Sequence, residues 1–330
     1  NTRSRGLGDV YKRQNLYLYK ELTIMINGIY AASLSILNED LELDYKKTTF
    51  HAEQLIDNGC HGVVFFGSTG QSQLISLGEK IQLINHLPNS KFKEKFIIGT
   101  GLNSLSDTIH LMKISKTLNF DKFLIMPPAY YSYGDEDVIN FYSKLIEQVN
   151  ECKIILYNFE KLSGYRFSKD CINELVDKFP EQIVGVKDST YNLYEDLQIE
   201  NFSVLPGSET KLLKGLELGC TGIITATANV TSLLARKVYD NFFNKSQQDS
   251  NKKLCDVRAV FDKYNLISGL HSFMSEKDAI YKNVLPPLKL LSEIEKKEML
   301  SNLKKLDFNI KNLKAARLAA DIADVPLIIL

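Results

Sequence analysis

Residues 182–187, Gln-Ile-Val-Gly-Val-Lys, form a short apolar run that ends in a charged side chain, and similar runs recur along the chain. Short runs rich in β-branched and aromatic residues are typical of strands buried on both faces. The eight runs are Gly28–Ser33, Gly62–Phe66, Phe96–Gly99, Lys122–Met126, Lys153–Tyr157, Gln182–Lys187, Ser203–Leu205 and Gly222–Thr225.

Longer amphipathic stretches separate these runs and predict helices. They are Tyr45–Asn58, Leu77–Leu87, Ser106–Leu118, Glu136–Asn150, Ser168–Phe179 and Glu209–Leu218, the last followed by Gly219, a residue that favours a helix end. Strands that alternate with helices pair in parallel through right-handed crossovers. Eight such units predict an α/β fold, the closed (β/α)8 or TIM barrel. An open doubly wound sheet is the alternative, but its dinucleotide-binding glycine motif is absent near the first run.

The chain divides into a barrel and a helical appendage. We expect the catalytic barrel over residues 25–230 and C-terminal helices over residues 231–313, with a break at Pro286-Pro287. The composition changes at both ends, since Arg is concentrated near the start and residues 315–330 are rich in Ala without any Lys. We interpret residues 1–24 as a non-native leader or scar, and residues 314–330 as a scar or a disordered tail.

A secretory signal is the alternative interpretation of the N-terminal segment. Lys20 and Glu21 interrupt its apolar stretch, and no small-residue cleavage site follows. We therefore expect the functional residues to lie between these two ends.

The charge and amino-acid composition argue against several classes of binding partner. The chain of 330 residues carries 40 basic and 40 acidic residues and is 44% hydrophobic, a balance that predicts neither nucleic-acid nor membrane binding. No apolar run reaches the roughly 18 residues that a membrane helix needs. The five Cys form no CxxC motif and the five His no HxH or HExxH motif. We therefore expect a cytoplasmic protein with reduced cysteines and no metal site.

In a TIM barrel the chemistry lies where strands end, and Lys187 ends the sixth run. Burial at the barrel mouth favours the neutral amine, which is a nucleophile toward ketones. The alternatives are a lysine that reaches solvent or one that pairs with Asp188. Tyr157 ends the preceding run, so its phenol is expected beside the Lys187 amine as a proton relay.

A tight turn, Gly67-Ser68-Thr69-Gly70, follows the second run. Backbone N–H groups in such a turn form a nest for an anion, and two hydroxyls add further donors. The turn is not a P-loop, because no Gly-Lys-Ser/Thr follows it. We expect it to bind a carboxylate.

The order of five short motifs resembles the dihydrodipicolinate synthase / N-acetylneuraminate lyase family of class I aldolases. The motifs are Gly67–Gly70, Tyr130-Tyr131, Tyr157-Asn158, Gly185-Val186-Lys187 and Pro206-Gly207-Ser208. The resemblance runs from about Asn27 to Asn312 and implies a barrel with C-terminal helices, usually a tetramer. It further implies a Schiff base between the lysine of the sixth strand and a 2-keto acid such as pyruvate.

Carried over by position, the resemblance assigns a role to each matching residue. Lys187 would form the imine, Tyr157 would relay protons, and Tyr131 would be lent across a subunit interface. Ser68 and Thr69 would bind the keto-acid carboxylate. The protonated imine would act as the electron sink, so that neither a metal nor a cofactor is required.

Several departures from the family pattern bear on substrate choice. Gln71 replaces a Glu, Glu160 replaces the Pro of Tyr-Asn-x-Pro, and Ser35-Ile36-Leu37 replaces Thr-Pro-Phe. Leu162 stands where dihydrodipicolinate synthases have an Arg for the carboxylate of aspartate semialdehyde, and Leu cannot form that bidentate pair. The sialic acid lyase branch has adjacent acidic residues after the seventh strand, of which only Glu209 matches before Thr210.

The chain is therefore expected to be a pyruvate-type lyase or aldolase that cleaves or dehydrates a 2-keto-3-deoxy (sugar) acid or condenses pyruvate with an aldehyde. The alternatives are a 4-hydroxy-tetrahydrodipicolinate synthase, which joins pyruvate and aspartate semialdehyde, and a catalytically silent keto-acid-binding barrel. We expect a homotetramer or dimer. The catalytic set is Lys187, Tyr157 and Tyr131; the substrate-binding set is Ser68, Thr69, Gly70, Leu162, Gly207, Ser208, Glu209 and Ile224.

Overall fold

The computed structural model describes residues 25–310, and these contain eight strands in one sheet. The strands are β1 (Gly28–Ala32), β2 (Gly62–Phe65), β3 (Phe96–Gly99), β4 (Lys122–Ile125), β5 (Lys153–Asn158), β6 (Ile183–Asp188), β7 (Ser203–Pro206) and β8 (Gly222–Thr225). Their spatial order is β7-β6-β5-β4-β3-β2-β1-β8, and all the paired strands are parallel.

The two ends of that order meet. β7 lies beside β8, and the Thr221 amide donates a hydrogen bond to the Val204 carbonyl oxygen at 3.1 Å. The sheet therefore closes into the predicted (β/α)8 barrel, and the open doubly wound alternative is excluded.

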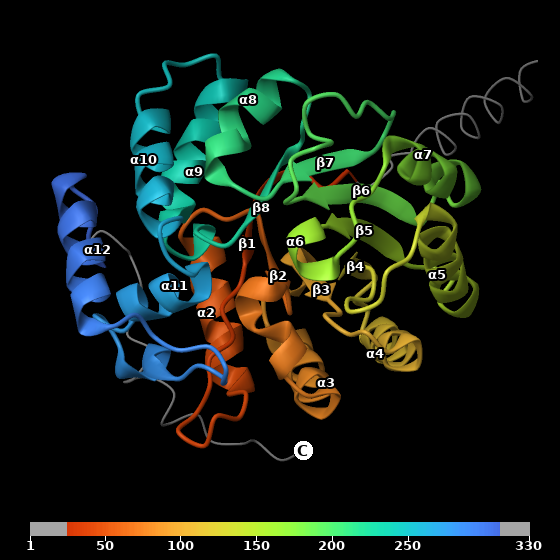
Figure 1. The fold of residues 1–330 in the computed structure, drawn as a ribbon, viewed down its shortest axis with the longest axis horizontal. Coiled ribbons are helices and arrows are strands. Elements are labelled where there is room, and N and C mark those ends of the chain that lie inside the picture. Colours follow the sequence, from red (N-terminus) through yellow and green to blue (C-terminus); the bar gives the residue numbers. More distant parts are fainter. Residues whose placement is uncertain (1–24, 311–330) are drawn as a thin grey trace, which may run out of the picture.

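Helices surround the barrel (Figure 1). They are α2 (Tyr45–Asp57), α3 (Leu77–His86), α4 (Leu105–Thr117), α5 (Asp135–Gln148), α6 (Glu160–Ser163), α7 (Lys169–Lys178), α8 (Leu212–Glu217) and α9 (Ala228–Phe243). Each connection between consecutive strands contains an α-helix except residues 189–202, between β6 and β7, which form turns. That irregular connection directly follows the strand that carries Lys187.

Local sequence explains where the helices begin and end. Ser76 and Glu79 form a reciprocal capping box at the start of α3. Gly219 follows α8 with φ +95°, which suits the predicted helix end. The helix expected over residues 209–218 begins later, because Ser208 caps a separate 3-10 turn over Glu209–Lys211 and α8 follows that turn.

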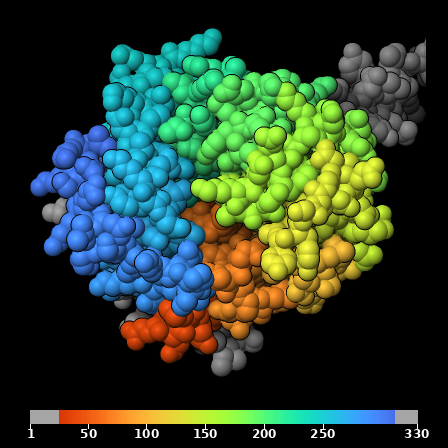
Figure 2. Space-filling view, in the orientation of Figure 1, coloured from red at the N-terminus to blue at the C-terminus, as the bar shows by residue number. Residues whose placement is uncertain are grey.

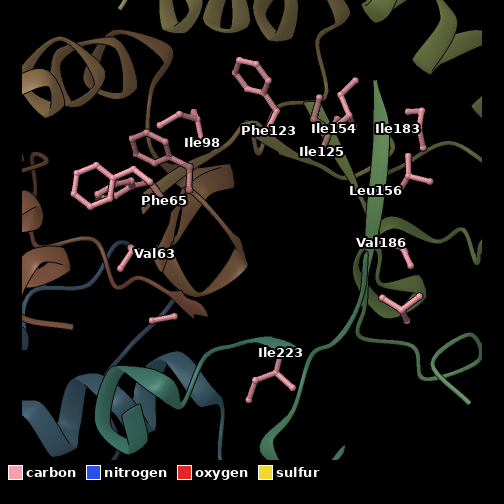
Figure 3. Packing of buried hydrophobic residues seen from close by; sticks show 14 of the residues in the cluster. Val63, Phe65, Ile98, Phe123, Ile125, Ile154, Leu156, Ile183, Val186 and Ile223 are labelled. Atoms are coloured by element: carbon pink, nitrogen blue, oxygen red, sulfur yellow. The ribbon is translucent and has the colours of Figure 1, made fainter. Parts of the chain in front are cut away.

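Two apolar layers hold the barrel together. Inside it, Val64, Ile155, Val184, Leu205 and Ile224 belong to one buried cluster. Alternate strand residues instead face the surrounding helices and form the largest cluster, whose labelled members in Figure 3 are Val63, Phe65, Ile98, Phe123, Ile125, Ile154, Leu156, Ile183, Val186 and Ile223. Burial on both faces explains why the strands read as continuous apolar runs.

The C-terminal helices cover one flank of the barrel (Figure 1). α9 packs against β1 and completes the ring, so the boundary expected at residue 230 falls inside α9. The appendage contains α10 (Asn251–Phe261), α11 (Leu266–Met274) and α12 (Glu293–Lys305), which share a second buried cluster with Leu34 and Ile36. The interpretations of residues 1–24 and 314–330 concern segments outside the described residues. Within residues 25–310 no helix is long and apolar enough to span a membrane.

Candidate active site

Lys187 and Tyr157 lie side by side on neighbouring strands. The register of β5 and β6 pairs Tyr157 with Lys187, and both residues are buried, Lys187 to 3% exposure. The Lys187 Nζ lies 4.1 Å from the centroid of the Tyr157 ring. The strands thus bring together the amine and the phenol that the sequence placed at their ends.

Lys187 takes part in none of the ion pairs found among residues 25–310. The carboxylate of Asp188, the alternative partner, accepts hydrogen bonds from the Asn158 amide and from the backbone of Tyr191, Leu193 and Tyr194. The structure therefore leaves the Lys187 amine without a carboxylate partner within this part of the chain.

The Gly67–Gly70 turn lies beside Tyr157. The hydroxyls of Ser68 and Tyr157 are 3.1 Å apart, and Thr69 is buried. Within the 3-10 turn the backbone hydrogen bonds begin at the Gly70 amide, which donates to Gly67, so the Ser68 and Thr69 amides precede them. A Cβ at Gly70 would lie 2.9 Å from the Ser33 carbonyl oxygen, so only glycine fits there.

Two of the residues that depart from the family pattern, Ser35 and Gln71, also contact this turn. Ser35 donates its hydroxyl to the Gly70 carbonyl oxygen at 2.7 Å. Gln71, in the left-handed region at φ 56°, accepts a hydrogen bond from the Leu285 amide at 2.7 Å. The turn is therefore held both by the loop after β1 and by the C-terminal appendage.

The predicted substrate residues after β7 separate into two groups. Gly207 and Ser208 follow the strand end, and a Cβ at Gly207 would lie 2.3 Å from the Ser189 Oγ, so the loops after β6 and β7 meet here. Glu209 instead has 0% exposure. Its carboxylate accepts hydrogen bonds from Thr225, Thr231 and Arg258, an arrangement that gives it protein partners in place of an open face toward a substrate hydroxyl.

The remaining predicted residues lie at the periphery or in the wall. Tyr131 is 74% exposed in the loop after β4, and Leu162 is 45% exposed on the short helix α6. Ile224 belongs to the cluster inside the barrel. Figure 2 shows the face that carries α6 hollowed near its centre. Lys187, Tyr157 and Ser68 are brought together, whereas Tyr131 and Leu162 are on the surface of this single chain.

Arg258, a buried residue of α10, is a charged residue near the site that the sequence does not predict. Its guanidinium donates to Glu209 Oε2 at 2.8 Å and to Asp262 Oδ1 at 2.8 Å. Burial alone would lower the pKa of Arg258, but the charges of Glu209 and Asp262 raise it above its ordinary value. No motif signals this pair, because Arg258 lies in a helix outside the strand-end pattern.

A second buried lysine was also missed. Lys80 of α3 donates its ammonium to the carbonyl oxygens of Thr100 and Gly101, and burial lowers the pKa of Lys80 to about 8. It lies in an amphipathic helix, where a lysine is normally exposed, so its burial has no signal in the sequence. Lys80 is a second amine to be distinguished from Lys187 in any chemical test.

The arrangement can carry out carbonyl chemistry. A buried amine without a carboxylate partner can attack a ketone, an adjacent phenol can move protons, and a hydroxyl-bearing turn can hold an anion. Among residues 25–310 no group of three or more His, Cys, Asp or Glu side chains is placed to hold a metal ion.

The chain matches a known protein family. The model of the dihydrodipicolinate synthetase family matches residues 25–306. A Karelsulcia muelleri protein named 4-hydroxy-tetrahydrodipicolinate synthase is 28% identical over 284 residues, covering 82% of this chain and 95% of the relative. An uncharacterized DapA-like lyase of Chloroflexus aurantiacus is 28% identical, covering 65% of this chain and 74% of the relative.

A solved structure shows the same fold. The dihydrodipicolinate synthase of Acinetobacter baumannii, crystallised in complex with pyruvate, superimposes with a TM-score of 0.79 at 26% identity. The match covers 86% of this chain and 100% of that one.

Proposed function

The chain belongs to the dihydrodipicolinate synthetase family of lyases, and we propose that it forms a Schiff base between Lys187 and a 2-keto acid of the pyruvate type. The observation that carries the proposal is the buried Lys187 amine, 4.1 Å from the Tyr157 ring and without an ion-pair partner among residues 25–310. The proposed reaction cleaves or dehydrates a 2-keto-3-deoxy acid, or condenses pyruvate with an aldehyde.

The first step joins the amine to the ketone. The Lys187 nitrogen attacks C2 of the keto acid, and the resulting carbinolamine loses water to give a protonated imine. When the C3–C4 bond breaks, its electron pair moves toward the imine nitrogen, an aldehyde leaves and an enamine remains. Protonation at C3 and hydrolysis then release pyruvate and the free lysine. In the reverse direction the enamine carbon attacks the aldehyde.

Tyr157 and the Gly67–Gly70 turn support these steps. The Tyr157 hydroxyl transfers the protons that carbinolamine dehydration and aldehyde departure require. Its hydrogen bond with Ser68 connects that proton path to the turn. The hydroxyls and backbone amides of Ser68 and Thr69 hold the keto-acid carboxylate, which places C2 within reach of Lys187. Gly70 contributes by letting the turn pack against the Ser33 carbonyl oxygen, where a Cβ would not fit.

The remaining groups concern the far end of the substrate. Leu162 provides no charge for a second carboxylate, so the preferred aldehyde portion is uncharged, as in a sugar acid. Gly207, Ser208 and Ile224 border this end. Glu209, bound to Arg258, contributes by fixing the loop after β7.

Assembly and location complete the proposal. Tyr131, at 74% exposure, is available to enter a neighbouring subunit's site, which supports a dimer or tetramer. The five cysteines are free in the described structure, as suits a cytoplasmic protein.

A 4-hydroxy-tetrahydrodipicolinate synthase is the second candidate, because a Karelsulcia muelleri relative carries that name at 28% identity. The same Schiff base would then attack aspartate semialdehyde. Leu162 argues against this substrate, since a leucine cannot pair with its carboxylate. Kinetics with aspartate semialdehyde and pyruvate decide between the two: the synthase requires this pair to be the most efficient one.

Borohydride reduction in the presence of pyruvate tests the Schiff base. We expect one covalent adduct by intact mass, mapped by peptide digestion to Lys187 and lost in Lys187→Ala. An adduct on Lys80, or one that persists in Lys187→Ala, would contradict the mechanism. A protein that binds pyruvate but forms no adduct would be the silent keto-acid-binding barrel. Pyruvate release from a panel of 2-keto-3-deoxy acids then identifies the substrate.

A further inference from the structure

The connection after Lys187 lacks the helix that the other strand connections have. Residues 189–202 run from β6 to β7 as turns, so no crossover helix fixes the strand end from outside. Tyr191 in this segment has φ +64°, an unusual value for a residue with a side chain. β6 is paired with β5 and β7 as far as Asp188, so what the absent helix leaves to other contacts is the outer face of the strand end.

Asp188 makes the contacts that hold this segment. Its Oδ1 accepts from the Tyr191 amide at 2.8 Å, and its Oδ2 from the Leu193 amide at 2.9 Å and the Tyr194 amide at 3.0 Å. The Asn158 side chain donates to Oδ1 at 2.9 Å. The carboxylate, on a residue with 0% exposure, thus receives four N–H groups from two different parts of the chain.

The partner of Asp188 on the next strand is itself fixed. Asn158 donates to both Asp188 and Asn192 and accepts from the Phe167 amide at 3.2 Å, so its amide orientation is determined by its neighbours. These bonds link the ends of β5 and β6 to the segments that follow them.

The register relates this polar pair to the reactive pair. Tyr157 pairs with Lys187, and the next residues, Asn158 and Asp188, pair with each other. Successive side chains of a strand point to opposite faces of the sheet. One pair of positions therefore carries the proposed chemistry inside the barrel, while the adjacent pair fastens the same two strand ends from the other face.

We propose that Asp188 is a positioning residue for Lys187: its carboxylate replaces the missing crossover helix and fixes the strand end from which the reactive amine projects. This inference rests on the proposed Schiff-base function. It differs from the ion-pair interpretation of Asp188, because here the carboxylate acts through the backbone and through Asn158 and does not contact the Lys187 amine.

The test is the rate of imine formation, measured by quenching with borohydride at a series of times and pyruvate concentrations. Asp188→Asn keeps the size of the side chain, but its amide nitrogen faces N–H groups that need an acceptor. A displacement of about 1 Å at the reacting centre can cost about 10²-fold in rate. We expect the maximal trapping rate to fall by about 10²-fold, with little change in the pyruvate concentration at half-maximal rate.

Asp135→Asn is the matched control. The Asp135 carboxylate, at the start of α5, also links two segments of the barrel, since it accepts from the Tyr165 and Ser168 hydroxyls, and neither of these partners lies in β6. All variants are compared at a temperature where circular dichroism shows them folded. We expect Asp135→Asn to trap pyruvate at the rate of the unsubstituted protein.

Asn158→Ala is the second variant, and its trapping rate tests the inference if Asp188→Asn does not fold. It removes one of the four bonds to the carboxylate, and we expect trapping to slow by about tenfold. Equal trapping rates in the positioning variant and the control, or a change only in the half-maximal pyruvate concentration, would overturn the inference. Absence of any adduct in the unsubstituted protein would instead overturn the proposed function.

Discussion

The hydroxyl groups of Ser68 and Tyr157 lie 3.1 Å apart, although 89 residues separate them in the sequence. The contact joins the turn after β2 to the end of β5. It connects the proposed carboxylate-binding turn with the proposed proton relay, so the two residues should affect the same step to different extents.

We expect Tyr157→Phe to lower the rate of imine trapping by at least about 10²-fold, because it removes the hydroxyl that moves protons. Ser68→Ala removes one neutral hydrogen bond and should cost about tenfold or less. Rapid quench with borohydride measures both rates. Tyr165→Phe is the control, since that hydroxyl bonds to Asp135; a loss as large as that of Tyr157→Phe would refute the relay.

Arg258→Met should destabilise the protein by about 3–5 kcal/mol, because it leaves the buried charge of Glu209 without its partner. Arg236→Met is the matched control: Arg236 pairs with Asp240 on the surface of α9, a type of pair that contributes roughly 0.2–1 kcal/mol. Urea unfolding gives both values. An equal decrease in the free energy of unfolding in the two variants would show that the buried pair stabilises the protein no more than the surface pair does.

The free energy of unfolding should fall as the pH is lowered from about 6.5 to about 4. Burial lowers the pKa values of His51 and His271 to about 4 in the folded protein. In the unfolded chain these residues therefore bind protons at a higher pH, about 6.5, so protonation favours the unfolded state as the pH falls. His51 Nε2 lies 2.8 Å from Asn229 Oδ1, an acceptor, so Nε2 carries a proton; in the neutral ring Nδ1 accepts from the Tyr281 hydroxyl.

Urea titrations at several pH values measure this dependence. His51→Gln should flatten the slope between pH 6.5 and 4. His110→Gln, on an exposed residue of α4, should leave it unchanged. An unaltered slope in His51→Gln would show that His51 titrates alike in both states.

Leu162→Arg should raise kcat/KM for aspartate semialdehyde with pyruvate by about tenfold or more, because a guanidinium can form charge-assisted bonds with its carboxylate. At 45% exposure the position accepts a long side chain without disturbing the core. Leu162→Gln separates the effect of charge from that of polarity. Steady-state kinetics with no gain in the Arg variant would show that the carboxylate of this aldehyde lies elsewhere.

Much of the fold was readable from the sequence. The run expected over Lys153–Tyr157 corresponds to β5 at Lys153–Asn158, and Gly62–Phe66 to β2 at Gly62–Phe65. Buried parallel strands need apolar residues on both faces, so each strand leaves a short continuous run. Because parallel strands end at one edge, the same pattern also predicted that Tyr157 and Lys187 would meet.

The partners of the charged residues were not readable in this way. The sequence predicts a substrate contact for Glu209, whereas the structure pairs its carboxylate with Arg258, which lies 49 residues further along the chain. The sequence leaves Asp188 as an alternative ion-pair partner of Lys187, yet its carboxylate accepts from the backbone of the next segment. The sequence shows that a carboxylate stands beside a strand end, but not which way it points.

The sequence by itself determined the alternation of strands and helices, favoured the closed barrel over an open sheet, and placed Lys187, Tyr157 and Ser68 at or just after strand ends. These follow from hydrophobic periodicity, which is a property of neighbouring residues. Only the tertiary structure decided which polar groups pair and which remain free. Hydrogen bonds and ion pairs depend on distances of a few ångströms between segments far apart in the chain, and packing alone sets those distances.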